Sequence, residues 1–183
     1  IKKPDAWMRP EGEEPYDERS ILSGLTVDEL ASGDRRAQRL RAELARLGAP
    51  ERPVSPGSFE PMKAKENVEP FTRKNWIFEI KYDGYRLIAA KDDGRARLFY
   101  RSRRECTDVF PDVVRFIAGQ PFDRFVVDAE VAVLGDDGKP SFQRLQRRTH
   151  LTRRVDIGRA EVELPAVLYV FDLLGFEQYD LRG

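Results

Sequence analysis

The chain has 183 residues, of which 40% are hydrophobic and 35% charged, so it can form a packed core and is not disordered throughout. Its 32 Lys and Arg side chains balance its 32 Asp and Glu side chains, so the overall charge argues neither for nor against nucleic acid as a partner. A single cysteine excludes an internal disulfide, and no apolar run reaches the ~18–20 residues of a membrane helix, so we expect a cytoplasmic protein with no membrane partner.

The first 60 residues differ in composition and hydrophobic patterning from the rest of the chain. Residues 1–20 are polar, contain prolines and lack periodicity, which predicts an extended or loop segment. Thr-Val-Asp-Glu at 26–29 is typical of a helix start, because the threonine hydroxyl can accept the amide three residues on. A second helix is expected before Gly48, with leucines that pack at helical spacing (Leu40, Leu44 and Leu47). The proline-rich run 49–61 then predicts a linker.

From about residue 74 the chain alternates apolar and polar residues in short runs rich in valine, isoleucine and aromatics, as strands do. Asp-Gly pairs at 93–94 and 137–138 predict tight turns between strands. Pro111 is expected to open a helix over 111–118, and 142–148 has a helical pattern. The sequence thus predicts an α+β fold, mostly antiparallel, with strands over 76–80, 85–91, 95–100, 124–134 and 166–174.

Charged side chains interrupt two of these predicted strands. In 76–81, one face is expected to be core (Trp76, Phe78, Ile80) and the other ends in Glu79 and Lys81. An Asp83-Gly84 turn and Arg86 follow. In 124–134, Asp128 and Glu130 point together, away from the apolar face that contains Val127, Ala129, Val131 and Val133. Burying carboxylates is costly without cations or a metal, so we expect the two strands to share one polar pocket.

The segment 81–86 resembles the Lys-x-Asp-Gly-x-Arg motif of ATP-dependent DNA ligases, RNA ligases and mRNA capping enzymes. Three later segments resemble ATP-dependent DNA ligase motifs in the correct order: YRSRRECTDVFP, VVDAEVAVLGDDGKPSFQRLQRR and LYVFDLL. The stretch GKPSFQRLQ is similar to that of bacterial non-homologous end-joining (LigD-type) ligases. IKKPDAW and SILSGLTVDEL, near the start, resemble the closing strand of a 3′-phosphoesterase domain and its tether to such a ligase.

The resemblance implies a division of the chain into three parts. Residues 1–25 would be the tail of the phosphoesterase-like domain, 26–60 an extended and helical linker, and 61–183 part of the adenylylation (nucleotidyltransferase) domain. The family's later Glu-Gly strand, its paired lysines and its oligonucleotide-binding domain would follow Gly183. We therefore expect a fold that is incomplete at the C-terminus and a chain that does not complete ligation.

The same resemblance implies that Lys81 is the catalytic nucleophile, which attacks the α-phosphorus of ATP and forms lysyl-AMP. An ordinary lysine amine is protonated at neutral pH, so Arg86, partial desolvation and Mg²⁺ (or Mn²⁺) would favour the neutral amine. The resemblance implies nucleotide- or phosphate-binding roles for Glu79, Ile80, Arg86, Arg101, Glu130 and Phe171. Of these, Glu79 would lie beside the adenine, Arg86 and Glu130 would serve the ribose or metal, and Phe171 would stack on the base.

Further roles also follow from the resemblance. Arg101 would bind the 5′-phosphate at a DNA nick, while Asp83 would orient the lysine or the turn and join Glu130 as a metal ligand. The sequence departs from the family pattern at Ala129 and at Arg103, where the family usually has glycine. Arg103 either alters the local turn or adds a phosphate contact.

The implied partners are nicked or broken double-stranded DNA and a Ku-type end-binding protein, in a bacterial cytoplasm at the nucleoid. An arginine-rich stretch would face DNA phosphates or form a solvated helix face (Arg144, Arg147, Arg148, Arg153 and Arg154). Two alternatives stay open: an RNA ligase or capping-type nucleotidyltransferase, and a non-catalytic DNA-binding module.

Overall fold

The computed structural model describes residues 26–28, 34–63, 69 and 71–182. The extended segment predicted over 1–20 lies outside these residues, and so does Glu29 of the helix start predicted at 26–29. No helix among the described residues is both long enough and apolar enough to cross a membrane.

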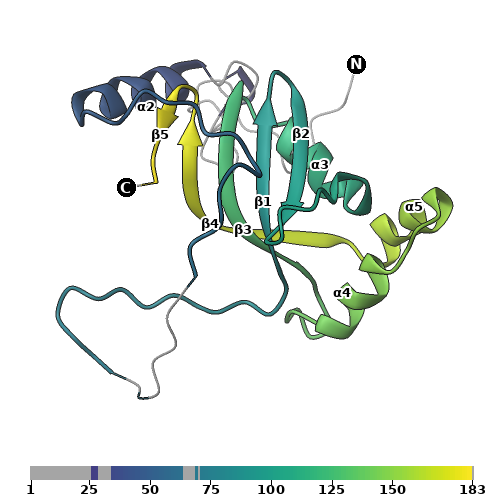
Figure 1. Ribbon diagram of the computed structural model, residues 1–183. Coiled ribbons are helices and arrows are strands. Elements are labelled where there is room, and N and C mark those ends of the chain that lie inside the picture. Colours follow the sequence, from purple (N-terminus) through teal and green to yellow (C-terminus); the bar gives the residue numbers. More distant parts are fainter. Residues whose placement is uncertain (1–25, 29–33, 64–68, 70, 183) are drawn as a thin grey trace, which may run out of the picture.

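One antiparallel sheet of five strands, in the order β2-β1-β3-β4-β5, organises the fold (Figure 1). Its strands are β1 (Tyr85–Asp92), β2 (Arg95–Tyr100), β3 (Arg124–Val133), β4 (Ala166–Phe176) and β5 (Tyr179–Asp180). The predicted α+β class and the four predicted strands from residue 85 onward are confirmed, while the two-residue β5 was not predicted. At the β1–β2 turn, Asp93 and Gly94 both have positive φ, 48° and 73°, as a two-residue hairpin turn requires.

The helices with described bounds lie around this sheet: α2 (Asp34–Arg46), α3 (Pro111–Ala118), α4 (Phe142–Thr149) and α5 (Arg154–Glu163). α3 begins at Pro111 as predicted, and Gly48 beyond α2 has a φ of 69°, as expected of a helix stop. Leu44 of α2 is buried, but Leu47 is 64% exposed, so the expectation that all three leucines pack was wrong for Leu47. A short 3₁₀ helix, Thr107–Val109, precedes α3.

The sheet is covered on both faces. Odd-numbered residues of β1 and β3 pack with α3 and α4 in one apolar cluster, which includes Leu87, Val131, Ile117 and Leu145. Even-numbered residues of the same strands form a second, smaller cluster, which includes Ile88, Ala90 and Val126. This second face also carries three side chains with predicted roles, Arg86, Asp128 and Glu130.

The proline-rich run predicted as a linker, 49–61, covers part of that second face; together with Met62 we call it the strap. The strap crosses the strands in front of the sheet in the view of Figure 1. Val54 is buried in the second cluster, against Gly175 of β4, where an added Cβ would lie 2.8 Å from the Val54 side chain. Arg52 bonds the Asp180 carboxylate at 2.6 Å. The strap is thus a packed part of the domain.

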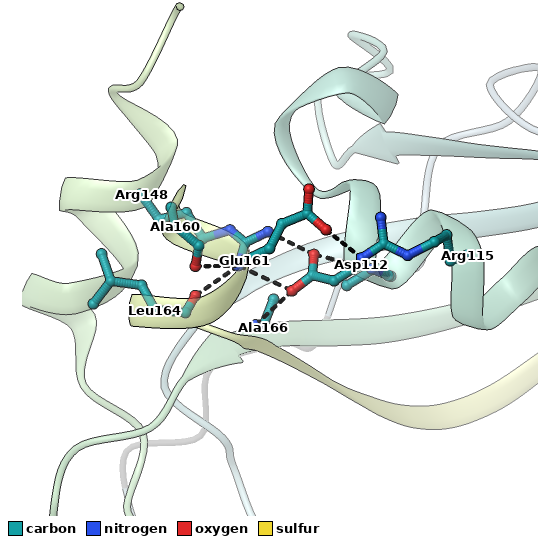
Figure 2. A network of polar contacts seen from close by, with 8 residues as sticks. Asp112, Arg115, Arg148, Ala160, Glu161, Leu164 and Ala166 are labelled. Atoms are coloured by element: carbon teal, nitrogen blue, oxygen red, sulfur yellow. Dashed lines mark hydrogen bonds and ion pairs between the residues drawn. The ribbon is translucent and has the colours of Figure 1, made fainter. Parts of the chain in front are cut away.

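A buried arginine joins three helices to the start of β4 (Figure 2). Arg148 of α4 is 1% exposed, and its guanidinium donates to both Asp112 carboxylate oxygens at 2.5 and 3.0 Å. It also donates to the carbonyl of Leu164 at 2.6 Å, just beyond the end of α5. Asp112 accepts the backbone amide of Ala166 at 2.9 Å. A cation at the C-terminal end of α5 also favours that helix through its dipole.

The predicted strand over 76–80 is absent. Residues 71–82 form an extended segment that runs away from the sheet before β1 begins (Figure 1). The expected core face is open to solvent: Trp76, Phe78 and Ile80 are 57%, 62% and 76% exposed. The physical reason is that none of the described strands pairs with this run, and an unpaired strand is not stable by itself.

Candidate active site

Lys81 stands at the end of the extended segment, with its side chain exposed. The neighbouring Tyr82 stacks on Tyr169 of β4, with ring centroids 3.7 Å apart and planes at 10°. Tyr169 pairs with Glu130 across the β3–β4 ladder. The aromatic pair therefore attaches the lysine-bearing loop to the sheet next to Glu130.

Gly84 brings the same loop against β3. A Cβ added at this position would lie 2.1 Å from the carbonyl oxygen of Val131, so only glycine allows this close approach of the two backbones. The Gly84 amide donates to the Glu130 carboxylate, which also interacts electrostatically with Lys81. The Asp-Gly step of the motif thus places Lys81 beside Glu130.

Arg86 and Asp128 form a two-bond ion pair on the sheet surface. The Arg86 Nε and Nη2 donate to the two Asp128 carboxylate oxygens at 2.9 and 2.6 Å. Asp128 is 2% exposed, and this hydrogen bonding raises the pKa of Arg86 above its usual value. The Arg86 Nη1 donates to the Met62 carbonyl of the strap at 2.5 Å, so three of its five N–H groups are already engaged.

Glu130 is the partly buried carboxylate beside Lys81. Burial raises its pKa above the ordinary glutamate value, and the Asp83 charge adds to this effect; Lys81, the Gly84 amide and Arg86 oppose it. Glu130 and Asp83 are thus close enough to repel each other, and a divalent cation would relieve that repulsion. Their carboxylate oxygens are the ligands that Mg²⁺ prefers. No cluster of three or more side chains suited to a metal occurs among the described residues, so water and phosphate oxygens would complete the coordination.

Phe171 lies beside the ion pair because of an irregularity in β4. The ladder pairs Asp128 with Asp172 and Ala129 with Val170, which leaves Phe171 as the extra residue of a bulge. Bulges redirect side chains near functional sites. Phe171 is 43% exposed, and the Arg86 guanidinium carbon lies 5.6 Å from its ring centroid. Its ring is thus available to a planar ligand.

Arg101 lies in a different place, on the turn after β2. The Arg103 amide donates to the Tyr100 carbonyl at 2.7 Å, and the Tyr100 amide donates to the Arg104 carbonyl at 2.9 Å. Arg103 has a φ of 68°, which makes the loop a three-residue hairpin whose last residue is left-handed, a position that favours glycine. No hydrogen bond or ion pair among the described residues links Arg101 to Lys81, Arg86 or Glu130.

The structure therefore brings Lys81, Asp83, Arg86, Glu130 and Phe171 into one neighbourhood. It leaves Glu79 and Ile80 exposed on the extended segment before the lysine, so their predicted contacts with the nucleotide stay predictions. Sequence reasoning missed three supporting contacts: the Asp128 ion pair, the Tyr82–Tyr169 stack and the Met62 carbonyl. The side-by-side carboxylates in β3 were a signal for the first, and no sequence pattern marks the other two.

The arginine-rich stretch does not act as one surface. Arg148 is buried, so the expectation that this residue faces solvent or DNA was wrong. Arg144 pairs with Asp136 at 2.7 Å and Arg153 with Asp156 at 2.6 Å. Of the five arginines, Arg147 and Arg154 are exposed and make no ion pair with another described residue.

Comparison with known families gives a match over most of the chain. Residues 58–182 match the family model described as "ATP dependent DNA ligase domain". The multifunctional non-homologous end joining protein LigD of Pseudomonas aeruginosa is 38% identical over 116 residues, which are 63% of this chain and 13% of that protein. A DNA ligase of Methanocaldococcus jannaschii is 30% identical over 155 residues, 82% of this chain and 25% of that protein. The chain thus spans a quarter or less of the length of these relatives.

Two solved structures are similar in sequence to part of this chain. The crystal structure of the ligase domain of Mycobacterium tuberculosis LigD is 35% identical, with a TM-score of 0.45 over 56% of this chain and 30% of that one. A mycobacterial DNA ligase D complexed with ATP and MES is 33% identical, with a TM-score of 0.43 and the same two coverages.

Proposed function

The chain belongs to the ATP-dependent DNA ligase domain family, and we propose that it carries the lysine that such a ligase charges with AMP. The observation that carries this proposal is the position of Lys81. The Gly84 contact and the Tyr82 stack place it beside Glu130, on the sheet face that also bears Arg86 and Phe171. A nucleophile, a carboxylate, a fixed guanidinium and an exposed ring are the parts needed to bind and open a nucleoside triphosphate.

In the proposed reaction, the neutral amine of Lys81 attacks the α-phosphorus of ATP. A nitrogen–phosphorus bond forms, the bond from the α-phosphorus to the bridging oxygen breaks, and the β- and γ-phosphates leave as pyrophosphate. The amine proton passes to solvent or a nearby base. The product is a lysyl-AMP phosphoramidate, and in the parent ligase the AMP then passes to a 5′-phosphate of DNA.

The residues around Lys81 support distinct parts of this chemistry. Arg86, whose guanidinium is oriented by Asp128 and the Met62 carbonyl, keeps two N–H groups for a ribose or phosphate oxygen. Phe171 offers a ring face to adenine. Glu130 and Asp83 would hold Mg²⁺ or Mn²⁺. When bound, the metal neutralises phosphate charge and makes pyrophosphate a better leaving group. From the family resemblance we also propose that Glu79 lies beside the adenine and that Ile80 contacts the nucleotide. Arg101 would bind the 5′-phosphate at a DNA nick.

For the parent protein we propose nick sealing in DNA repair and double-strand break end joining, in the bacterial cytoplasm at the nucleoid. The support is the identity of 38% to a LigD protein whose name describes non-homologous end joining. Nicked or broken double-stranded DNA is the proposed substrate, and a Ku-type protein is the proposed partner at the ends.

One structural feature favours a second candidate, a DNA-binding module without catalysis. The segment 71–82 that leads to Lys81 pairs with no described strand, and its apolar side chains are exposed. A nucleophile on such a segment is less firmly held than one on a paired strand.

The deciding experiment is incubation with α-labelled ATP and Mg²⁺ or Mn²⁺, followed by denaturing electrophoresis. We expect an acid-labile protein label that is lost in Lys81→Ala and retained in Lys74→Ala, a control lysine of the same segment. Label that survives Lys81→Ala would refute the nucleophile assignment. Absence of label, together with salt-sensitive DNA binding that is unchanged in Lys81→Ala, would favour the non-catalytic module.

A further inference from the structure

A cavity separate from the Lys81 site lies between the strap and the turn after β2. Its volume is about 420 Å³, and it is lined by Glu60, Pro61, Lys63, Arg101 and Ser102. Two cations, a hydroxyl and the Glu60 carboxylate therefore border one space, although they come from segments about 40 residues apart in the chain. The two cations and the hydroxyl donate hydrogen bonds, and the two cations outnumber the one carboxylate.

Both walls of this cavity are fixed by the fold. On the strap side, Pro61 is buried and the Met62 carbonyl accepts from Arg86, so the backbone that bears Lys63 is held next to the sheet. On the other side, two backbone hydrogen bonds close the turn from Tyr100 to Arg104. The backbone of both walls is thus part of the packed domain, and the exposed side chains of Lys63 and Arg101 extend from it.

The two cations are weakly compensated. Among the described residues, the Lys63 amine pairs with the Glu60 carboxylate at 3.9 Å, and both side chains are more than half exposed. Arg101 has no ion-pair partner among the described residues. A guanidinium and an ammonium that face one space without a strong counter-charge favour a ligand with several acceptor oxygens, and a phosphate group is the anion that suits both.

The strained turn supports the same conclusion. Arg103 occupies a left-handed conformation, with φ at 68°, that costs a non-glycine residue about 1–2 kcal/mol. Glycine would remove this cost, yet the chain has a third cation there, next to the two cavity-lining residues of the turn. Backbone strain that is retained at a charged position is a reason to look for a ligand.

We propose that this cavity is a phosphate-binding subsite in which Lys63 is a further contact residue opposite Arg101. The inference rests on the proposed function, because it assigns a new residue to the phosphate contact expected of Arg101. The phosphate belongs to the DNA substrate or to the nucleotide, and both sources have the same chemistry. The strap would then connect two sites, since Met62 contacts Arg86 while Lys63 contacts the phosphate.

The test compares Lys63→Gln, Arg101→Gln and the double variant with Lys139→Gln, an exposed lysine on the turn after β3. Three probes are used: a nicked duplex with a 5′-phosphate, the same duplex without it, and ATP with Mg²⁺. Each lost phosphate contact lowers the salt-dependence slope of duplex binding by about 0.9. A rise from 50 to 200 mM salt should therefore weaken DNA binding by Lys63→Gln about 3.5-fold less than binding by the wild type.

If both cations contact one phosphate, the double variant should lose less affinity than the product of the two single losses. A loss confined to the phosphorylated nick assigns the nick phosphate, an equal loss on both duplexes assigns a backbone phosphate, and a loss with ATP alone assigns the nucleotide. The proposal is overturned if Lys63→Gln matches Lys139→Gln with all three probes. Lys81-dependent labelling is measured separately. If the protein is labelled but Lys63→Gln binds every probe as Lys139→Gln does, the phosphate subsite alone is refuted. If Lys63→Gln weakens binding but the protein is not labelled, the proposed function alone is refuted.

Discussion

The buried Arg148 offers the sharpest test of what holds the helices to the sheet. In Arg148→Met, an unbranched side chain replaces the aliphatic part of the arginine but removes every polar contact of the guanidinium (Figure 2). Asp112 then loses its cation, and the Leu164 carbonyl loses the donor at 2.6 Å. The Ala160 carbonyl is less affected, because it also accepts the Leu164 amide at 2.9 Å.

The expected magnitude follows from these contacts. Removal of one partner of a buried ion pair costs about 3–5 kcal/mol, and the low end applies because Asp112 is 18% exposed and keeps the amides of Val113 and Ala166. One unsatisfied carbonyl adds about 1 kcal/mol. We expect a total loss of about 4 kcal/mol, a large part of the ~5–15 kcal/mol that stabilises a typical domain.

Urea unfolding, followed by far-UV circular dichroism, measures this loss. With a slope of about 2 kcal/mol per molar urea, the midpoint should fall by about 2 M. Arg148→Lys should lose about half as much, because an ammonium keeps the charge but not the planar fork. The control is Arg153→Met, which removes an arginine that is 79% exposed and paired with Asp156; we expect a loss below about 1 kcal/mol. If Arg148→Met is as stable as Arg153→Met, the reasoning about this network is refuted.

Three further predictions concern the candidate active site and its neighbouring turn. Gly84→Ala should lower stability by about 1–3 kcal/mol and abolish Lys81 labelling, because the new Cβ meets the Val131 carbonyl at 2.1 Å; an unchanged labelling rate would contradict this. Glu130→Gln should raise the thermal midpoint at neutral pH, because burial raises the pKa of Glu130 and its charged form destabilises the fold. This difference in thermal midpoint should shrink as the pH falls through the raised pKa of Glu130 towards the pKa of an ordinary glutamate. A difference that grows at acid pH would show that the charged form of Glu130 stabilises the fold. Arg103→Gly should leave the urea midpoint unchanged or raise stability by up to about 1 kcal/mol, since relief of the left-handed strain offsets the added chain entropy; a loss above 1 kcal/mol would show that the arginine stabilises the turn.

Local signals in the sequence predicted the elements that depend on local physics. The β1–β2 hairpin follows from Asp93-Gly94, whose positive φ values the turn needs, and α3 begins at the proline that suits a first helical turn. α5 was missed because Val155, Ile157 and Gly158 lower its helix propensity. Its end is stabilised by Arg148, whose bonds to Ala160 and Leu164 come from another helix and leave no local pattern.

The strand expected over 76–80 depends on a pairing partner, which no local signal in the sequence can show. Its alternation of apolar and polar residues is strand-like, but alternation predicts only which faces a strand would have and does not supply a neighbour. The extended segment there makes few backbone hydrogen bonds, of which the Trp76 amide to the Arg73 carbonyl at 3.3 Å is one. For the strap, a proline-rich run with no periodicity gave no sign that it packs on the sheet. Val54 is nevertheless buried, and Arg52 pairs with Asp180, which also pairs with Arg182.

At the candidate site, the motif identified the reacting residues but not what orients them. Arg86 is fixed by Asp128, which lies 42 residues later in the chain, and by the Met62 carbonyl 24 residues earlier. Its guanidinium also lies near the Phe171 ring on β4. Three segments thus converge on the Arg86 side chain, and none of these contacts follows from the six-residue motif. The geometry that would activate Lys81 is therefore a property of the assembled sheet and strap, and substitutions at Asp128 or in the strap should affect nucleotide binding without touching the motif itself.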